Sequence, residues 1–343
     1  MKPLLAIVLA IVVATLGFGG IASPAPDPSL TNSEHPGSAL IFPKFIRGTV
    51  GGLPASTFEI GVTCPEDAPN CLIGGTNKVL IHAYWVCPGS PDGSTAGQCH
   101  GTDFDLRTVL HGKLEFDGTG RVTVGPSDLN GGIIPAPPCE EGFLVAVVAN
   151  QAGVPVAYNG LVGEAVLRFT PGSASAYNAV TIQSPAPAGT LLGGLDLDGV
   201  SYQKVSSRLV GDVKFEKLQA PTIRTFITII NPASLPGGLN PPVAMPVNFY
   251  RANGAPLSDI IRFTCFRQVR LTQINANLTN AKMGKKGLLD ASSDAIALQS
   301  AGNVLAGQRV PVLGLVTTIE DGATPAQSKE YTYHLYGKGP GAP

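Results

Sequence analysis

Glycine and proline interrupt this chain so often that long helices have little room to form. There are 42 glycines and 30 prolines among its 343 residues, and a proline inside a helix or a central strand removes a backbone hydrogen bond. The runs between them are short and rich in β-branched and aromatic residues, as in Val79–Val86 and Val243–Tyr250. This pattern predicts an all-β fold of antiparallel strands connected by tight turns.

Predicted strands recur along the whole chain, and turn dipeptides such as Asp117-Gly118 and Asn253-Gly254 separate them. Seven runs have the strand composition: Val79–Val86, Phe143–Val148, Val156–Tyr158, Ala165–Phe169, Thr225–Ile230, Val243–Tyr250 and Tyr331–Tyr336. Helical periodicity is confined to Leu288–Leu298, where one short helix is expected. Short antiparallel strands of this kind favour β-sandwich domains that are immunoglobulin-like or jelly-roll-like.

Strings from the first half of the chain recur in the second half in the same order. The matched pairs are Ser38–Phe45 with Ser207–Phe215, Thr57–Ile60 with Thr225–Thr228, His82–Trp85 with Val247–Tyr250, and Asp105–Arg107 with Gln268–Arg270. A fixed order at a slowly drifting spacing indicates an internal duplication; chance similarity among β-rich segments is the alternative. We therefore predict two tandem β-sandwich domains, over residues 38–188 and 205–340, joined by a linker over residues 189–204.

The N-terminus has the parts of a secretory signal peptide. Lys2 is followed by the uncharged apolar run Leu4–Phe18 and by the small residues of Gly20-Ile21-Ala22. We predict a signal peptide over residues 1–22 and a disordered leader over residues 23–37, which are rich in proline and serine. No later stretch is long and apolar enough to span a bilayer, so no membrane span is expected after cleavage. The expected location is secreted, periplasmic or at the cell surface.

Six cysteines follow the predicted signal peptide: Cys64, Cys71, Cys87, Cys99, Cys139 and Cys265. An even number in an exported chain favours disulfides over metal or thiol chemistry. Cys64 with Cys71, and Cys87 with Cys99, enclose short turn-rich loops and are the expected local pairs. Cys139 with Cys265 would then form a long-range pair. Six cysteines allow many connectivities, so the sequence leaves the pairing open.

Composition and motifs argue against two classes of function. Charged residues make up 14% of the chain and the formal net charge is −1, whereas nucleic-acid binding needs clustered cations that displace phosphate counterions. We therefore expect no nucleic-acid partner. The nucleophile elbow, the zinc-binding helix motif and the phosphate-binding loop are all missing from the sequence. No cofactor is expected except calcium.

Calcium or a glycan is a candidate ligand. Asp196 and Asp198 stand two residues apart before Gly199, which is a fragment of a calcium-binding loop. An ordinary Asp/Gly turn explains the same string. Glycan sites usually expose flat aromatic rings, but Trp85 is the single tryptophan and lies in an apolar strand. We expect it to be buried close to Cys87.

A hydrolytic site is the remaining candidate, and it would have to be assembled from residues far apart in the chain. His100 with Asp103 and Asp105 is the closest grouping of a histidine and carboxylates, and such groups act as bases or metal ligands. Glu141 is a further candidate for the same site. A turn leading into a strand also explains the first three residues.

Several strings resemble a group of uncharacterised exported bacterial proteins that are rich in β-strands. They are Gly37–Phe45, Asp103–Leu106, Leu161–Ala165 and Ser175–Ala179. The resemblance covers most of the chain after the signal peptide. It implies a location in the bacterial envelope or outside the cell, and it supplies no site residues.

These observations lead to three hypotheses. The first is a secreted, non-enzymatic structural or adhesive protein, whose sheet edges or loops bind another copy or a cell-surface partner. The second is a calcium- or glycan-binding module. The third is a secreted hydrolase with a site carried by loops.

Overall fold

The computed structural model describes residues 35–65, 71–72, 75–88, 97–99, 101–125, 133–197, 199–232, 239–240, 243–293 and 310–337. In these ranges the chain is all-β and its sheets are antiparallel, which confirms the predicted fold class. The predicted signal peptide and residues 23–34 of the predicted leader lie outside the described residues, so both stay predictions. Gly37, the last residue of that leader, already pairs with Leu161.

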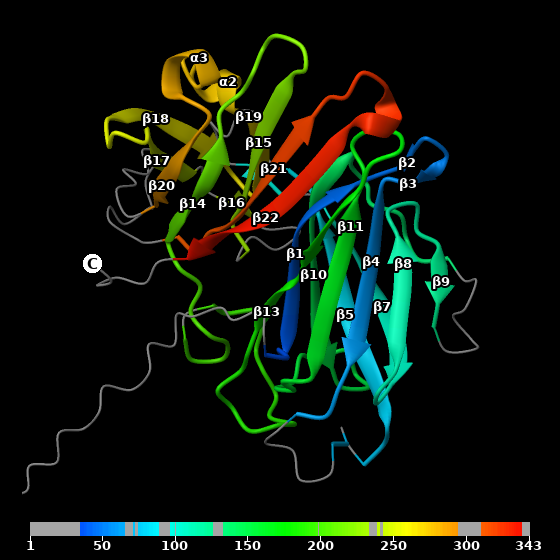
Figure 1. The fold of residues 1–343 in the computed structure, drawn as a ribbon. Helices are drawn as coiled ribbons and strands as arrows, with labels where there is room; N and C mark the ends of the chain where they lie inside the picture. Colours follow the sequence, from blue (N-terminus) through cyan, green and yellow to red (C-terminus); the bar gives the residue numbers. More distant parts are fainter. Residues whose placement is uncertain are drawn as a thin grey trace, which may run out of the picture.

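The first half of the chain forms two five-stranded sheets (Figure 1). Their strands are β1 (Ala39–Ile46), β4 (Ser56–Val62), β5 (Lys78–Val86), β7 (Gly101–Val109), β8 (Lys113–Asp117), β9 (Val122–Val124), β10 (Glu141–Ala149), β11 (Leu161–Leu167), β12 (Ser175–Asn178) and β13 (Val180–Ile182). One sheet has the order β13-β1-β10-β5-β7 and the other the order β12-β11-β4-β8-β9. A small hairpin of β2 (Thr49–Val50) and β3 (Leu53–Pro54) stands beside them.

Trp85 lies in the hydrophobic core that these two sheets share, and it is fully buried, as predicted. Its ring contacts Phe45 and Phe58 edge-on, with centroids 5.1 and 5.5 Å apart, a preferred aromatic geometry. Its Nε1 donates a hydrogen bond of 2.8 Å to the carbonyl of Pro135, so the polar group of the buried ring has a hydrogen-bond partner. Cys87 belongs to the same core, in agreement with the expectation that Trp85 is buried close to it.

Strands β1 and β10 are buried on both faces. Nearly every residue of both strands is buried, because their sequences are apolar runs, broken only by Lys44 in β1 and by Glu141 at the start of β10, rather than alternating ones. One face looks into the core around Trp85. The other is covered by residues from the predicted linker, such as Leu192 and Tyr202, and by Phe266 and Leu313 of the second half. The predicted linker therefore packs against the sheet.

The second half forms one eight-stranded sheet, drawn from yellow-green to red in Figure 1. Its strands are β14 (Arg208–Lys214), β15 (Ile223–Ile230), β17 (Val243–Tyr250), β18 (Pro256–Phe263), β19 (Phe266–Arg270), β20 (Lys286–Ser292), β21 (Leu313–Glu320) and β22 (Lys329–Gly337). The order is β18-β17-β20-β14-β22-β21-β15-β19, and the sheet curls into a nearly closed, barrel-like wall around a second core. A short pair, β6 (Gly97–Gln98) with β16 (Leu239–Asn240), links the two halves.

This arrangement differs from the predicted second sandwich of two separate sheets. Strand β22 pairs with β21 along most of its length, and its last residues, Tyr336 and Gly337, pair with Val210 and Leu209 of β14. Strand β22 therefore connects the strands β18, β17, β20 and β14 on one side with the strands β21, β15 and β19 on the other. All eight form a single continuous sheet.

The predicted helix over Leu288–Leu298 is wrong as far as the structure describes it. Residues up to Ser292 belong to β20, which lies between β14 and β17, and residues 294–298 lie outside the described part of the chain. Pairing on both sides overrides a weak local helical preference. Within the described residues, the helices are α2 (Leu271–Ile274) and α3 (Asn280–Met283), with a 3-10 turn at Pro325–Gln327.

All six cysteines form disulfides, and one of the three predicted pairs is confirmed. Cys64 pairs with Cys71. The predicted pairs Cys87 with Cys99 and Cys139 with Cys265 are wrong, because Cys87 pairs with Cys139 and Cys99 pairs with Cys265. Strands β5 and β10 are neighbours, with Val86 opposite Phe143, so the sheet brings Cys139 next to Cys87. Cys99 forms its disulfide with Cys265, which lies in the second half of the chain.

Three disulfides indicate an oxidising, extracytoplasmic compartment. Within the described ranges, no helix has the length and apolar character needed to cross a bilayer.

Candidate functional site

The predicted calcium ligands are only partly described. Asp196 is exposed, and Asp198 lies outside the described residues. Across the part of the chain that the structure covers, no three histidine, cysteine or carboxylate side chains gather where they could hold a metal ion. The calcium site stays a prediction. Trp85 is buried and therefore cannot stack on a sugar.

The predicted cluster of His100, Asp103 and Asp105 contains a different histidine. His100 is outside the described residues, but Asp103 and Asp105 both lie beside His82 of β5. The Nδ1 atom of His82 is 2.7 Å from Asp105 Oδ1, and its Nε2 atom is 3.9 Å from Asp103 Oδ2. Register explains the contact, since His82 stands opposite Asp105 and Tyr84 opposite Asp103.

Tyr84 completes this group on the outer face of the sheet. Its ring meets the His82 ring edge-on, with centroids 4.6 Å apart. Burial, and then the charges of Asp103 and Asp105, raise the pKa of the Tyr84 hydroxyl. Alternation indicates that His82 and Tyr84 share one face of β5, because residues two apart on a strand point to the same side, but it does not identify β7 as the partner strand.

Glu141, the other predicted hydrolase residue, has a structural partner. Its carboxylate forms an ion pair with the ammonium of Lys44, and the Lys44 side chain is only 1% exposed. The adjacent Glu140 is exposed and lies 4.0 Å from Arg47. Glu141 and Asp103 thus make separate contacts, and the structure does not join them in one site.

Lys44 lies where the two halves of the chain meet. Its Nζ is 5.9 Å from the centre of the Phe169 ring and 5.1 Å from that of Phe266 in the second half, distances at which an ammonium is attracted to a ring face. Burial lowers the pKa of Lys44, and the charge of Glu141 opposes that shift. The residue neutralises Glu141 and fills the junction.

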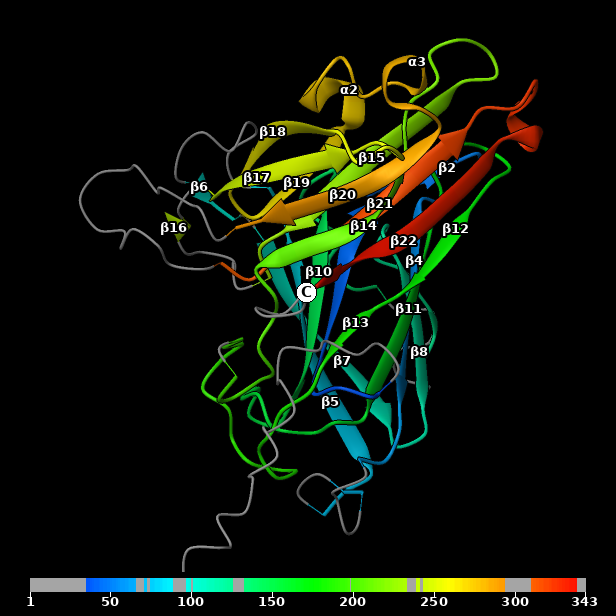
Figure 2. The ribbon, with the colours of Figure 1, turned by 60° about the vertical axis from the view of Figure 1, so that its left-hand side comes forward.

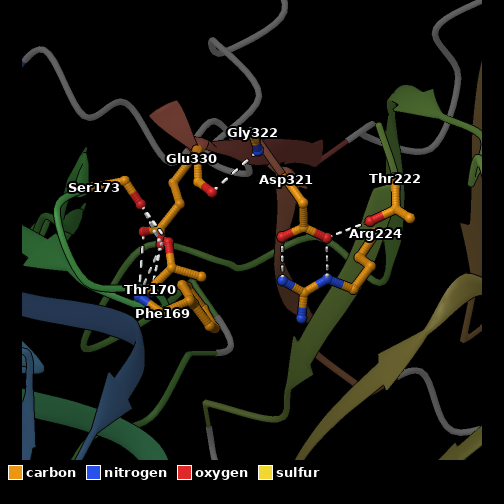
Figure 3. Close-up of polar contacts among 9 residues, drawn as sticks. Phe169, Thr170, Ser173, Thr222, Arg224, Asp321, Gly322 and Glu330 are labelled. Atoms are coloured by element: carbon orange, nitrogen blue, oxygen red, sulfur yellow. Dashed lines mark hydrogen bonds and ion pairs between the residues drawn. The ribbon is translucent and has the colours of Figure 1, made fainter. Parts of the chain in front are cut away.

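Glu330 of β22 ties the second half to a turn of the first half (Figure 3). Its buried carboxylate accepts hydrogen bonds from the backbone N–H groups of Phe169 and Thr170, at 3.0 and 2.7 Å. The hydroxyls of Thr170 and Ser173 donate to the same Oε1 atom at 2.8 and 2.7 Å. Charge-assisted bonds of this kind are stronger than neutral ones, so this contact holds the junction closed.

Two more contacts extend this junction along β22, which runs beside β12 in Figure 2. The hydroxyls of Ser175 and Thr332 are 2.7 Å apart. His334 donates from Nε2 to the carbonyl of Asn178 at 2.6 Å, and burial lowers the pKa of its imidazole. The two halves therefore meet through a continuous strip of polar contacts as well as through a shared core.

An open cleft of about 180 Å³ lies at the far end of β21. Asp321 on its wall is held by Arg224, whose Nε and Nη2 donate at 3.1 and 2.6 Å (Figure 3). The hydrogen bonds from Arg224 lower the pKa of Asp321. Glu320, also on the wall, is paired with Lys214 at 2.6 Å. Both carboxylates are thus engaged in structural pairs.

The long edge strand of the eight-stranded sheet, β18, is closed by its own side chains. Arg251 N donates to Ala255 O, so in the register of β17 and β18 the even-numbered residues of β18 turn their backbone groups outward. Pro256 has no N–H to offer, the N–H of Ile260 donates to the Asp259 carboxylate at 2.8 Å, and the Arg262 carbonyl accepts from Arg267 at 2.7 Å. These are devices that prevent pairing with another chain.

A scan against models of known protein families finds no match, and a search of curated proteins finds no similar sequence. The candidate roles of this chain therefore depend on its geometry. The polar contacts described above hold strands and halves together, whereas the buried hydroxyl of Tyr202 has no hydrogen-bond partner among the described residues.

Proposed function

We propose that the chain is an exported, non-enzymatic protein with a structural or adhesive role in the bacterial envelope or the extracellular space. The observation that carries the proposal is the way its halves are joined. Cys99 and Cys265 link them covalently, and Glu330 binds across the junction. A body fixed at several points suits a protein that must keep its shape while it is attached to something else.

The shared core gives further support for a rigid body. Leu315 of the second half belongs to the core around Trp85. In the other direction, Ile230 and Phe266 pack with residues of β1 and β10. Moving one half against the other would expose this apolar surface, at a cost of about 25 cal/mol for each Å².

The compartment is supported by the disulfides and by the sequence of the N-terminus. Disulfides persist where the environment is oxidising, and residues 1–22 have the composition of a signal peptide. The resemblance to exported bacterial proteins favours the envelope or the extracellular medium. The proposal covers a periplasmic, a cell-surface and a secreted location.

The proposal includes an internal duplication, which the strand pairings support. In the first half β1 pairs with β10, β10 with β5 and β5 with β7; in the second half β14 pairs with β20, β20 with β17 and β17 with β18. Likewise β4 lies between β11 and β8, as β15 lies between β21 and β19. Strand β22 corresponds to β12 and β13 together. It pairs with both β21 and β14, just as β12 pairs with β11 and β13 pairs with β1.

The pairings align the two halves differently from the matched strings. Trp85 faces the first core opposite Leu144, and Phe249 faces the second core opposite Leu289. Trp85 therefore corresponds to Phe249 rather than to Tyr250. The match of Asp105–Arg107 with Gln268–Arg270 joins β7 to β19, although the pairing equates β7 with β18. An experimental structure in which the halves superpose only in another strand order would overturn the duplication.

The functional proposal is tested by binding to cell envelopes. The purified, disulfide-bonded chain is mixed with washed envelopes of the bacterium that encodes it, and the mixture is sedimented. We expect saturable retention in the pellet, and weaker retention for a Cys99→Ser/Cys265→Ser variant, because its halves are no longer linked. A chain that stays in the supernatant at every concentration, or that fractionates with the cytoplasm, would show that the proposal is wrong.

A further inference from the structure

Strand β7 is an edge strand that no described part of the chain closes. It pairs with β5 on one side and ends the sheet order on the other. Among the described residues, no backbone or side-chain group contacts its outer edge between Asp103 and Arg107 by a hydrogen bond. The other first-half edges, β9, β12 and β13, are only three or four residues long.

The register of the β5–β7 pair identifies which backbone groups face outward. Leu110 N donates to Asn77 O at 2.8 Å, and the same register places Lys78 opposite Val109. Hydrogen-bonded pairs alternate with non-hydrogen-bonded ones in an antiparallel ladder. The even-numbered residues of β7 therefore bond to β5, and Asp103, Asp105 and Arg107 turn their N–H and C=O groups to the free edge.

The side chains of these three outward-facing residues are also exposed. Asp103 and Asp105 are 71% and 46% exposed. Within the ranges that the structure covers, the Arg107 side chain forms no ion pair or hydrogen bond. Charged residues often protect an edge against pairing, but here both signs occur on one strand, so the pattern discriminates between registers.

An antiparallel copy of β7 brings opposite charges together, without any like-charge pair, in one register. When the two-fold axis passes through Leu106, Asp105 of each copy stands opposite Arg107 of the other, and Asp103 stands opposite Val109. When the axis passes through Asp105, Asp103 stands opposite Arg107 twice, but the two Asp105 side chains face each other as like charges. A parallel, in-register copy puts like charges together at every charged position. Opposite charges stabilise cross-strand pairs and like charges destabilise them.

We propose that β7 is a docking edge for a second copy of this chain, which binds antiparallel about Leu106. Two five-stranded sheets join into one continuous sheet across the dimer, with two Asp105–Arg107 ion pairs over the seam. The inference rests on the proposed structural or adhesive function and names its partner. One strand pair buries less than the roughly 1,000 Å² of a stable interface, so the dimer is weak and depends on concentration.

Charge exchange tests the register. Asp105→Arg and Arg107→Asp each place like charges opposite one another twice, and each should raise the dimer dissociation constant by about tenfold or more. Mixing the two variants restores both ion pairs, so the mixture should form heterodimers although neither variant dimerises alone. Sedimentation equilibrium of the disulfide-bonded chain measures all three samples, and thermal unfolding checks that each variant is folded.

Backbone groups provide an independent readout in the unmodified chain. The amides of Asp103, Asp105 and Arg107 should exchange with solvent quickly at low concentration and slowly at high concentration, whereas Leu106 is protected throughout. Asp105→Pro removes an outward N–H and should abolish the dimer. The matched control is Ser258→Pro on β18. The Ser258 N–H also points outward, but it lies on the edge that its neighbours close, so this substitution should leave the dimer dissociation constant unchanged.

Two results would overturn the inference. One is a chain that stays monomeric over the whole concentration range. The other is a dimer that tolerates both charge reversals and shows no exchange protection on β7. If envelopes retain the unmodified chain and both charge variants equally while no dimer forms, the proposed function stands and the docking edge is refuted. If dimers form but envelopes retain none of the chain, the docking edge stands and the proposed function is refuted.

Discussion

Removing the Glu330 carboxylate gives the sharpest test of how the two halves are held together. Glu330→Ala deprives the backbone N–H groups of Phe169 and Thr170 of their acceptor. The hydroxyls of Thr170 and Ser173 are 2.5 Å apart and keep each other as partners. The loss therefore falls on two backbone donors that bond to a buried charge.

The size of the effect follows from those two donors. A hydrogen bond to a charged group contributes about 1.5–3 kcal/mol, and Phe169 and Thr170 are only partly buried, so water can replace part of what is lost. We expect Glu330→Ala to lower the free energy of unfolding by about 3 kcal/mol. Glu330→Gln keeps one acceptor oxygen and loses the charge, so it should cost about half as much.

Guanidinium unfolding provides the assay, with two signals. Trp85 fluorescence reports the first half, because that residue is the single tryptophan and lies in the first core, and circular dichroism reports the whole chain. Both transitions should coincide in the unmodified chain and also in Glu330→Ala, where both move to lower denaturant, because the shared cores and the Cys99–Cys265 disulfide still join the halves. Glu59→Ala is the control, since its ion pair with Lys113 is about half exposed and contributes about 0–1 kcal/mol. If Glu330→Ala is no more destabilising than that control, the junction does not depend on this carboxylate.

Three further predictions use the same unfolding assay. Glu141→Gln leaves the buried Lys44 ammonium without a counter-charge and should cost about 3 kcal/mol, whereas Lys44→Met removes the charge and should be nearly neutral; equal losses would contradict this account. Opening Cys99–Cys265, which spans 166 residues, should cost about 5 kcal/mol by loop entropy, more than opening the 7-residue span of Cys64–Cys71; the reverse order would refute it. Burial lowers the pKa of His334 from 6.5, so below pH 6.5 the unfolded chain binds a proton that the folded chain refuses. Stability should then decrease as the pH falls towards the folded-state pKa, and His334→Phe should flatten that part of the profile.

Strand positions could be predicted from the sequence because strand composition is a local property. Val243–Tyr250 coincides with β17, and Val79–Val86 lies within β5. Val156–Tyr158 is an exception, since it makes only isolated bridges, such as Val156 with Leu191. Asn159 and Gly160 end that run before a ladder can form. Composition therefore locates extended segments but does not guarantee them a partner strand.

Contacts between segments could not be predicted, because they depend on which strands become neighbours. Nothing in the spacing of Cys87 and Cys139 indicates that β5 and β10 lie side by side. The contact of His82 could not be predicted for the same reason. Its partner Asp105 is 23 residues away, and the contact exists only in one register of β5 and β7. Glu330 is separated from Thr170 by 160 residues, and an isolated glutamate in a strand gives no signal that it will be buried.

The comparison of the two halves shows how far similarity of strings can mislead within a sheet. Successive side chains of a strand point to opposite faces, so a shift of one residue exchanges every buried position for an outward one. Matching Trp85 with Tyr250 pairs two aromatic residues, yet Trp85 is fully buried and Tyr250 is not. Phe249 is fully buried and occupies the same place between its neighbouring strands. Burial selects residues by face, so the alternation of buried positions is a better guide to equivalence than residue type, and it requires the pairing to be known.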